Sequence, residues 1–124
     1  MKRELGFVCA GGVLALCIFG CAAAGPIEEG QQAYDRGDYA TAAQLCLPLA
    51  ERGDARAEYL LGMLYDLGHG VPKNYVQAAY WFRKAADQGV GEAQANLGAL
   101  YASGLGVPLD YKKAILLWGE AAQN

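Results

Sequence analysis

Apolar residues recur at helical spacing through most of the chain, and the same arrangement returns 36 residues later. Between residues 75 and 86 they occupy positions i, i+3, i+4, i+7, i+10 and i+11, which form one face of a helix. The members of this stripe are Tyr75, Ala78, Ala79, Phe82, Ala85 and Ala86, and they return as Tyr111, Ala114, Ile115, Trp118, Ala121 and Ala122. Each stripe predicts an amphipathic helix, and its recurrence predicts a repeated structural unit.

An alignment of residues 54–88 with residues 90–124 needs no gap and gives 13 identical residues in 35 positions. The identities are Ala57/Ala93, Leu61/Leu97, Gly62/Gly98, Leu64/Leu100, Tyr65/Tyr101, Gly68/Gly104, Gly70/Gly106, Val71/Val107, Pro72/Pro108, Tyr75/Tyr111, Ala78/Ala114, Ala85/Ala121 and Ala86/Ala122. A period of this length is typical of stacked units that bury their apolar faces against neighbouring copies. The alignment therefore predicts a helical array.

The first half of each unit predicts another helix, with Gly62 and Gly98 inside it. Glycine costs about 1 kcal/mol relative to alanine within a helix. Because both copies keep the glycine at the same phase, we expect a neighbouring helix to approach too closely for a side chain. The Gly-x-Gly-Val-Pro segments at 68–72 and 104–108 predict left-handed turns that end these first helices.

A third and shorter copy lies upstream, over residues 27–53. Its second-helix stripe is Tyr39, Ala42, Ala43, Cys46, Leu49 and Ala50. A two-residue link replaces the long loop, so this unit resembles a tetratricopeptide hairpin whose first helix spans residues 27–36. Cys46 stands where the other copies have Phe82 and Trp118, so we expect its side chain to be buried as a small hydrophobic group.

The pattern A-x-x-x-L-G-x-L-Y, followed by G-x-G-V-P and Y-x-x-A, resembles the Sel-one-like repeat, a relative of the tetratricopeptide repeat. Two full copies cover residues 54–89 and 90–124, and the shorter unit completes a repeat domain over residues 25–124. The resemblance implies an all-α fold, a short right-handed α-solenoid of about three antiparallel helix hairpins. It also implies a non-enzymatic adaptor that binds other proteins.

In this superfamily the first helices line a concave groove, which implies that their variable positions contact the partner. The groove candidates, which differ between the two copies, are Arg56, Tyr59, Met63, Asp66, Glu92 and Asn96. Tyr59 and Met63 are side chains of the kind that anchor partners in such grooves. Ordinary surface variation explains the same differences, so the groove set is a hypothesis.

The composition argues against several classes of function. The chain has 10 basic and 13 acidic residues; apart from Lys2, Arg3 and Glu4, eight and twelve remain, a net charge of −4. Without a basic block, nucleic acid is not an expected partner. His69 is the one histidine and lies in a loop where the next copy has Leu105, so we expect it to face solvent rather than bind a metal. The sequence shows no catalytic, metal-binding or cofactor-binding constellation.

The chief alternative function is a secreted β-lactamase-like or small-ligand-binding repeat protein. Some secreted members of the family carry paired cysteines in each repeat and are linked to β-lactam binding or hydrolysis. Residues 54–124 contain no cysteine, which argues against that branch. A fragment or degenerate paralogue that keeps only its structure is the third alternative.

Residues 1–24 have the pattern of a secretory signal peptide. Lys2 and Arg3 precede an uncharged apolar run over residues 8–19, and small residues follow. An uncleaved membrane anchor is the alternative, and it needs the alanines at 22–24 to approach spanning length.

Two cleavage sites compete at the end of this segment. Residues 18–21, Ile-Phe-Gly-Cys, resemble a bacterial lipobox, which implies cleavage before Cys21 and attachment of lipid to it. Ala22 in the next position then resembles the outer-membrane sorting pattern. Conventional cleavage after Ala24 would instead release a soluble product. An outer-membrane lipoprotein is favoured, and a soluble periplasmic or secreted protein is the alternative.

The chain ends directly after the second helix of the last copy. Solenoids normally need a polar capping repeat at their ends. We therefore expect the surface around Ile115, Leu116, Leu117 and Trp118 to be partly exposed and to favour self-association or the binding of a partner.

Overall fold

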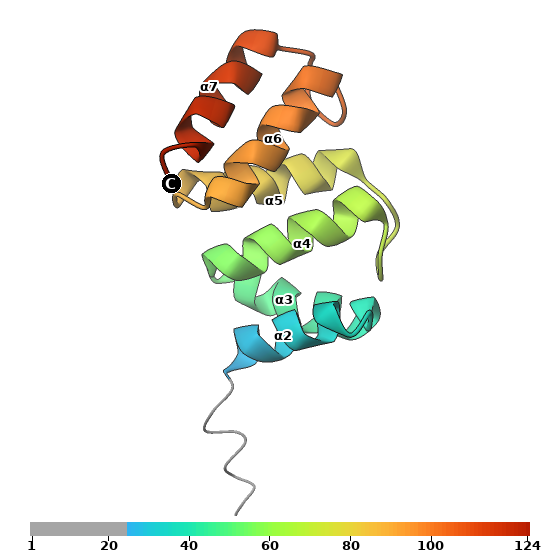
Figure 1. Cartoon of the computed structure of the whole chain (residues 1–124). Coiled ribbons are helices and arrows are strands. Elements are labelled where there is room, and N and C mark those ends of the chain that lie inside the picture. The colour runs from blue at the N-terminus through green and yellow to red at the C-terminus, as the bar shows by residue number, and fades with distance from the viewer. Residues whose placement is uncertain (1–24) are drawn as a thin grey trace, which may run out of the picture.

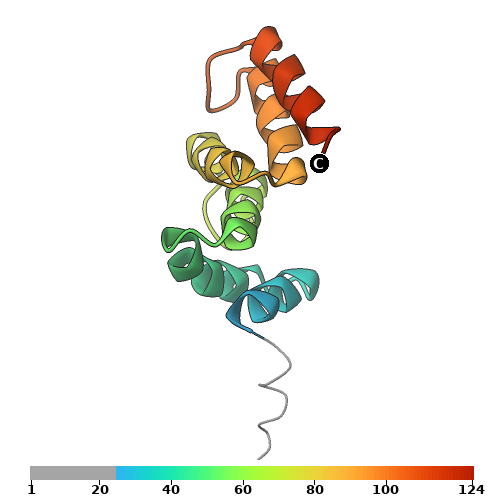
Figure 2. The same cartoon turned by 90° about the vertical axis from the view of Figure 1, so that its left-hand side faces the viewer.

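The computed structural model describes residues 25–124, and within this range the chain forms six α-helices and no strand. The helices are α2 (Pro26–Asp35), α3 (Tyr39–Glu51), α4 (Ala55–Leu67), α5 (Tyr75–Asp87), α6 (Gly91–Ser103) and α7 (Tyr111–Ala121). Successive helices pair as hairpins, and the three hairpins stack from α2 at one end to α7 at the other (Figures 1 and 2). The predicted all-α stack of about three hairpins is confirmed.

The predictions for residues 1–24 lie outside the described residues. They include the signal helix, the lipobox and the lipid attachment at Cys21. Within the described part of the chain, no helix combines the length and the apolar character that a membrane span needs.

Side-chain caps fix where most of these helices begin. The Asp54 carboxylate accepts hydrogen bonds from the backbone N–H groups of Arg56 and Ala57, both at 3.0 Å. The side chains of Asn74 and Asp110 each accept from the N–H three residues further on, at 3.1 Å. These acceptors satisfy amides that a helix start leaves without a partner. The second helices α5 and α7 therefore begin at the same position of the repeat, whereas α6 begins after Val90 without a side-chain cap.

Each first helix carries a glycine against which the second helix packs. A Cβ on Gly62 would lie only 2.6 Å from Cδ1 of Phe82. The same contact joins Gly98 to Trp118 and Gly30 to Cys46. The close approach predicted at the two repeat glycines is confirmed, and the shorter hairpin packs in the same way.

The two long loops fold back onto the preceding hairpin. A Cβ on Gly70 would meet the backbone of Tyr39, and one on Gly106 would meet the backbone of Tyr75. Both glycines have positive φ, as predicted. His69 stacks on the Tyr39 ring with 4.3 Å between the centroids. The prediction that His69 faces solvent is therefore wrong, because the loop presses this half-buried side chain onto the hairpin before it.

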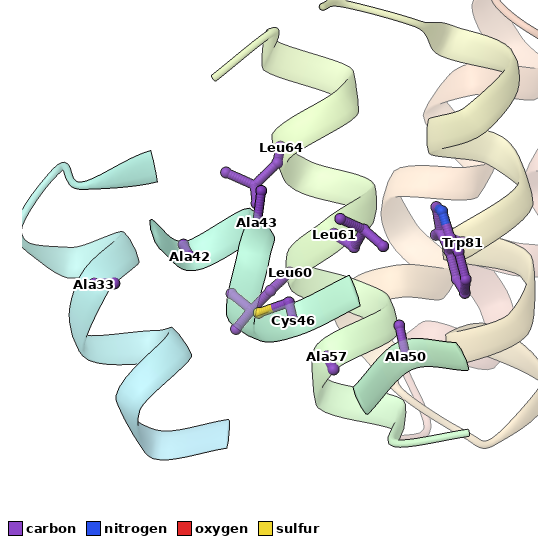
Figure 3. Packing of buried hydrophobic residues seen from close by; sticks show 10 residues of the cluster. All are labelled: Ala33, Ala42, Ala43, Cys46, Ala50, Ala57, Leu60, Leu61, Leu64 and Trp81. Atoms are coloured by element: carbon purple, nitrogen blue, oxygen red, sulfur yellow. The ribbon is translucent and has the colours of Figure 1, made fainter. Parts of the chain in front are cut away.

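The core consists of two clusters, each of which joins neighbouring hairpins. The first contains Ala33, Ala42, Ala43, Cys46, Ala50, Ala57, Leu60, Leu61, Leu64 and Trp81 (Figure 3). The second contains Ala78, Ala79, Phe82, Ala85, Ala86, Ala93, Leu97, Leu100, Tyr101 and Ala114. In the first cluster, the α4 leucines lie beside small residues of α3. The predicted burial of Cys46 is confirmed, and the hairpins depend on one another for their cores.

The last helix is more exposed than its counterparts. Ile115, Leu116 and Trp118 are exposed and Leu117 is half-buried, as predicted for this end of the array. Tyr111, which belongs to the predicted apolar stripe, is also exposed.

Candidate protein-binding groove

A cleft of about 320 Å³ runs across the first helices of all three hairpins. Its lining residues are Gln31 of α2, Ala55, Arg56 and Tyr59 of α4, and Val90 and Glu92 at the start of α6. The cleft spans three hairpins because each hairpin packs on the next, α3 against α4 and α5 against α6. Three of the predicted groove residues, Arg56, Tyr59 and Glu92, meet in it.

Tyr59 forms the aromatic part of the cleft. Its ring lies over Phe82, with the centroids 6.0 Å apart and the planes at 41°. Burial raises the pKa of the Tyr59 hydroxyl, and the nearby Glu92 carboxylate raises it further. The half-buried ring is therefore held from below by the core, while its hydroxyl stays protonated and able to donate a hydrogen bond.

Opposite charges line the same cleft as this ring. A guanidinium nitrogen of Arg56 lies 3.8 Å from a carboxylate oxygen of Glu28, which joins α4 to α2. Both side chains are about half exposed, so the pair contributes at most about 1 kcal/mol to stability. Arg56 keeps further donors for a partner, and Glu92 offers an acceptor at the start of α6.

Met63 and Asn96 continue the same strip along α4 and α6. The Asn96 side-chain amide lies 3.5 Å from the Met63 sulfur. The same amide interacts with the Tyr59 hydroxyl and opposes the rise of its pKa. Both residues are half-buried. They lie next to Tyr59 but do not line the cleft.

Asp66 stands apart from the other candidates. It lies in the last turn of α4, where burial raises the pKa of its carboxyl and the nearby Lys73 opposes that rise. No described contact joins it to the other five. The structure therefore brings five of the six predicted residues together and leaves Asp66 beside the loop.

Three lining residues are absent from the predicted set, namely Gln31, Ala55 and Val90. The last two differ from their counterparts in the other copy, so the rule that selected the groove candidates also covers them. Gln31 lies on the short first hairpin. Gly30 and Gly62 can be aligned because each packs against the second helix of its own hairpin, and Gln31 then takes the position of Met63. This alignment comes only from the structure.

The described residues do not assemble a metal site. No three His, Cys, Asp or Glu side chains gather between residues 25 and 124 in a way that could hold an ion. Burial, with a smaller effect of the Asp54 charge, raises the pKa of the Cys46 thiol to about 11. This thiol is therefore protonated at neutral pH and is a poor nucleophile.

Comparison with known proteins identifies the repeat. A family model described as the Sel1 repeat matches residues 55–90 and 91–124. The chain is similar to the crystal structure of a Sel1 repeat protein from Oxalobacter formigenes, at 34% identity and a TM-score of 0.76, over 81% of this chain and 40% of that one. A comparison with the curated proteins gave no match.

Two further solved structures are similar. One is c5321, described as a protective antigen present in uropathogenic Escherichia coli strains displaying an SLR fold, at 33% identity and a TM-score of 0.73. The match covers 86% of this chain and 24% of that one. Helicobacter pylori cysteine rich protein B, at 19% identity and a TM-score of 0.63 over 77% of this chain and 88% of that one, shares the fold. The chain spans less than half the length of the first two proteins.

Proposed function

Since the chain belongs to the Sel1 repeat family, whose members generally mediate protein–protein interaction, we propose that it is a non-enzymatic adaptor of the bacterial cell envelope. Its partner is a protein segment that lies in the cleft across α2, α4 and α6. The observation that supports this function is the placement of Tyr59, a half-buried aromatic ring supported by Phe82 and flanked by opposite charges.

The chemistry of the cleft describes the segment that it would accept. The Tyr59 ring and Val90 offer an apolar surface, which suits an aromatic or aliphatic side chain of the partner. An acidic residue of the segment would pair with Arg56, and a basic one with Glu92. The two charges lie on different first helices, so they also fix the direction in which a segment lies.

The envelope location is proposed from the sequence of residues 1–24. The order of positive start, apolar run and Ile-Phe-Gly-Cys supports export and the attachment of lipid to Cys21. Several acyl chains would hold the repeat domain at a membrane, since each buried methylene contributes about 0.8 kcal/mol. Metabolic labelling with a fatty acid tests this: Cys21→Ser should abolish the label, and an equally labelled variant would contradict the proposal.

Quantitative affinity capture from the cells that make the protein tests the groove. A tagged full chain is compared with Tyr59→Ala and with Glu92→Lys, which changes an exposed residue without touching the core. We expect both variants to lose a partner about ten-fold, which corresponds to about 1.4 kcal/mol of binding free energy. Tyr80→Ala, which removes an exposed tyrosine of α5, is the matched control and should retain the partner. Equal capture by the Glu92 variant and the control would refute the groove.

A further inference from the structure

A second cleft, of about 300 Å³, lies between α5 and α7 and shares no lining residue with the groove across α2, α4 and α6. Both α5 and α7 pack against α6, which contributes the buried side chains of Leu97 and Tyr101 to the cleft. Leu116 and Leu117 of α7 add to this apolar surface. The second helices of two successive hairpins therefore border a cleft with an apolar bottom, the α5–α7 cleft.

Two positive side chains meet at Tyr101. A guanidinium nitrogen of Arg83 donates a hydrogen bond of 2.9 Å to the Tyr101 hydroxyl. The ammonium nitrogen of Lys113 lies 5.1 Å from the centroid of the same ring, within the range of a cation–π interaction. Because Tyr101 is only 7% exposed, the core holds its ring in place, and the ring positions both cations. This end of the α5–α7 cleft is therefore positive.

Two carboxylates, those of Asp87 and Glu120, line the opposite end of the cleft. Both also line an adjoining cleft together with Gln94. On α6, Gln94 lies about two helical turns before Tyr101, a distance of about 10 Å along the helix. The charges are therefore separated along the α5–α7 cleft, with the positive end at Tyr101 and the negative end near Gln94.

These charges do not neutralise one another. Within residues 25–124, no carboxylate oxygen lies within 4.0 Å of the side-chain nitrogens of Arg83 or Lys113. Asp87 and Glu120 likewise form no ion pair in this part of the chain. The cleft therefore offers donors at one end and acceptors at the other, and its charge is complementary to a ligand that carries both signs.

The same face is open at the preceding junction of hairpins. The counterparts of Arg83, Lys113 and Leu116, 36 residues earlier, are Leu47, Gln77 and Tyr80. All three counterparts are exposed, although the hairpin of α6 and α7 follows them in the stack. Stacking of a further hairpin therefore leaves this face accessible.

The preceding junction carries a different set of charges. Leu47 and Gln77 are uncharged, and Lys84 takes the position of Glu120, so the two signs are not separated there. Both junctions nevertheless pack through the same apolar stripes. The separated charges of the α5–α7 cleft are therefore not needed for stacking.

Exposed walls make this cleft a better site for a protein segment than for a small molecule. Its charged side chains and Leu116 are all exposed, whereas a pocket for a small molecule buries most of the ligand surface. A protein segment can cover such walls, and its own side chains can reach both ends of the cleft.

We propose that the α5–α7 cleft binds a second protein segment, in which an acidic and a basic side chain stand on either side of an apolar one. The acidic side chain pairs with Arg83 and Lys113, the basic one pairs with Asp87 and Glu120, and the apolar one packs on Leu97 between them. The two charges of the segment lie about 6–10 Å apart, because the opposite charges are one helical turn apart on α5 and two turns apart on α7. The site is separate from the proposed groove, so the chain can hold two proteins at once.

Selection from a displayed library of short random peptides tests this site. The targets are the parent full chain in mild detergent, a cleft variant, Lys113→Glu/Glu120→Lys, and a control variant, Lys112→Glu/Glu51→Lys. Both variants keep the net charge, but only the cleft variant changes lining residues, where it mixes the signs at both ends. We expect peptides with an acidic and a basic residue around an apolar one to be enriched on the parent and the control variant, and not on the cleft variant. Absence of this class, or its equal enrichment on all three targets, would overturn the proposal.

Fluorescence anisotropy with one enriched peptide measures the effect on affinity. The cleft variant and Asp87→Lys should each bind at least ten-fold more weakly than the parent, and the control variant should bind like the parent. All the substituted residues are exposed, and unchanged circular dichroism will show that the variants fold. Tyr59→Ala should also bind the peptide like the parent, so failure of the groove and failure of the α5–α7 cleft are distinguishable. Equal affinity of the cleft variant and the control variant for the peptide would refute the site.

Discussion

The Gln88 side-chain amide donates a hydrogen bond of 2.9 Å to the Glu58 carboxylate, joining the end of α5 to the start of α4. The same nitrogen donates at 2.9 Å to the carbonyl of Gly53, which precedes α4. The pair returns 36 residues later, where Asn124 donates to Gln94 at 2.7 Å. Each full hairpin is therefore closed at its open end by a polar pair, in addition to its apolar core.

Gln88→Met should destabilise the protein. Glu58 is only 1% exposed, so loss of its donor leaves a buried carboxylate without this partner, at a cost of about 1–3 kcal/mol. Urea denaturation measures the change in the free energy of unfolding. Gln44→Met replaces an exposed glutamine of α3 and should stay within about 0.5 kcal/mol of the parent. Equal effects of the two substitutions would show that the pair contributes nothing.

Gly62→Ala should also destabilise the fold, although alanine is the better helix former. The added methyl group would press on the fully buried Phe82 ring, and overpacking of this kind costs about 1–3 kcal/mol. Gly119→Ala meets open space and should stabilise the protein by about 0.5–1 kcal/mol. Chemical denaturation measures the free energy of unfolding of the two variants. If both substitutions changed the free energy of unfolding in the same direction, the packing described at Gly62 would be contradicted.

The free energy of unfolding of Asp66→Asn should depend less on pH than that of the parent chain. Burial raises the pKa of Asp66 in the folded state, so the folded protein binds this proton more tightly than the unfolded chain does. The stability that this carboxyl contributes is therefore full below its unfolded pKa of 3.8 and is lost as the pH rises through its folded pKa. At neutral pH the variant should be more stable, by less than about 1 kcal/mol because the site is half exposed. If the difference in the free energy of unfolding between Asp66→Asn and the parent chain does not change with pH, the prediction is wrong.

Cys46 should resist alkylation while the protein is folded. Its buried thiol has a pKa raised to about 11, so almost no thiolate exists at pH 8. Peptide mapping after treatment with iodoacetamide should find Cys46 unmodified in buffer and modified in urea. Equally fast labelling in both solutions would mean that the contact of Cys46 with Gly30 is open.

The sequence was sufficient for the features that depend on local spacing. Helical stripes, turn glycines and the close approach at Gly62 all repeat at one period, so each copy supports the interpretation of the other. The stack of His69 on Tyr39 could not be predicted in this way, because it joins residues of different hairpins through a loop. Polar residues at helix ends, such as Glu58 and Gln88, are usually exposed, and only the packing shows that these two meet.

Only part of the groove was predicted, because the prediction used differences between the two full copies. Variation between the two full copies selects positions on α4 and α6, so it found Tyr59 and Glu92. It could not find Gln31, because the short link of the first hairpin shifts α2 relative to the 36-residue period. It selected Asp66 although this residue lies beside the loop, because variation does not distinguish the sides of a helix.

Site-specific photo-cross-linking in the cells that make the protein tests whether a protein partner binds in the cleft. A photoreactive phenylalanine analogue is placed at Tyr59 in the cleft or at Tyr80 on the exposed side of α5. We expect a discrete cross-linked protein from position 59 that disappears with Glu92→Lys and is absent from position 80. Identical products from both positions, or a product from position 59 that persists in the Glu92 variant, would contradict it.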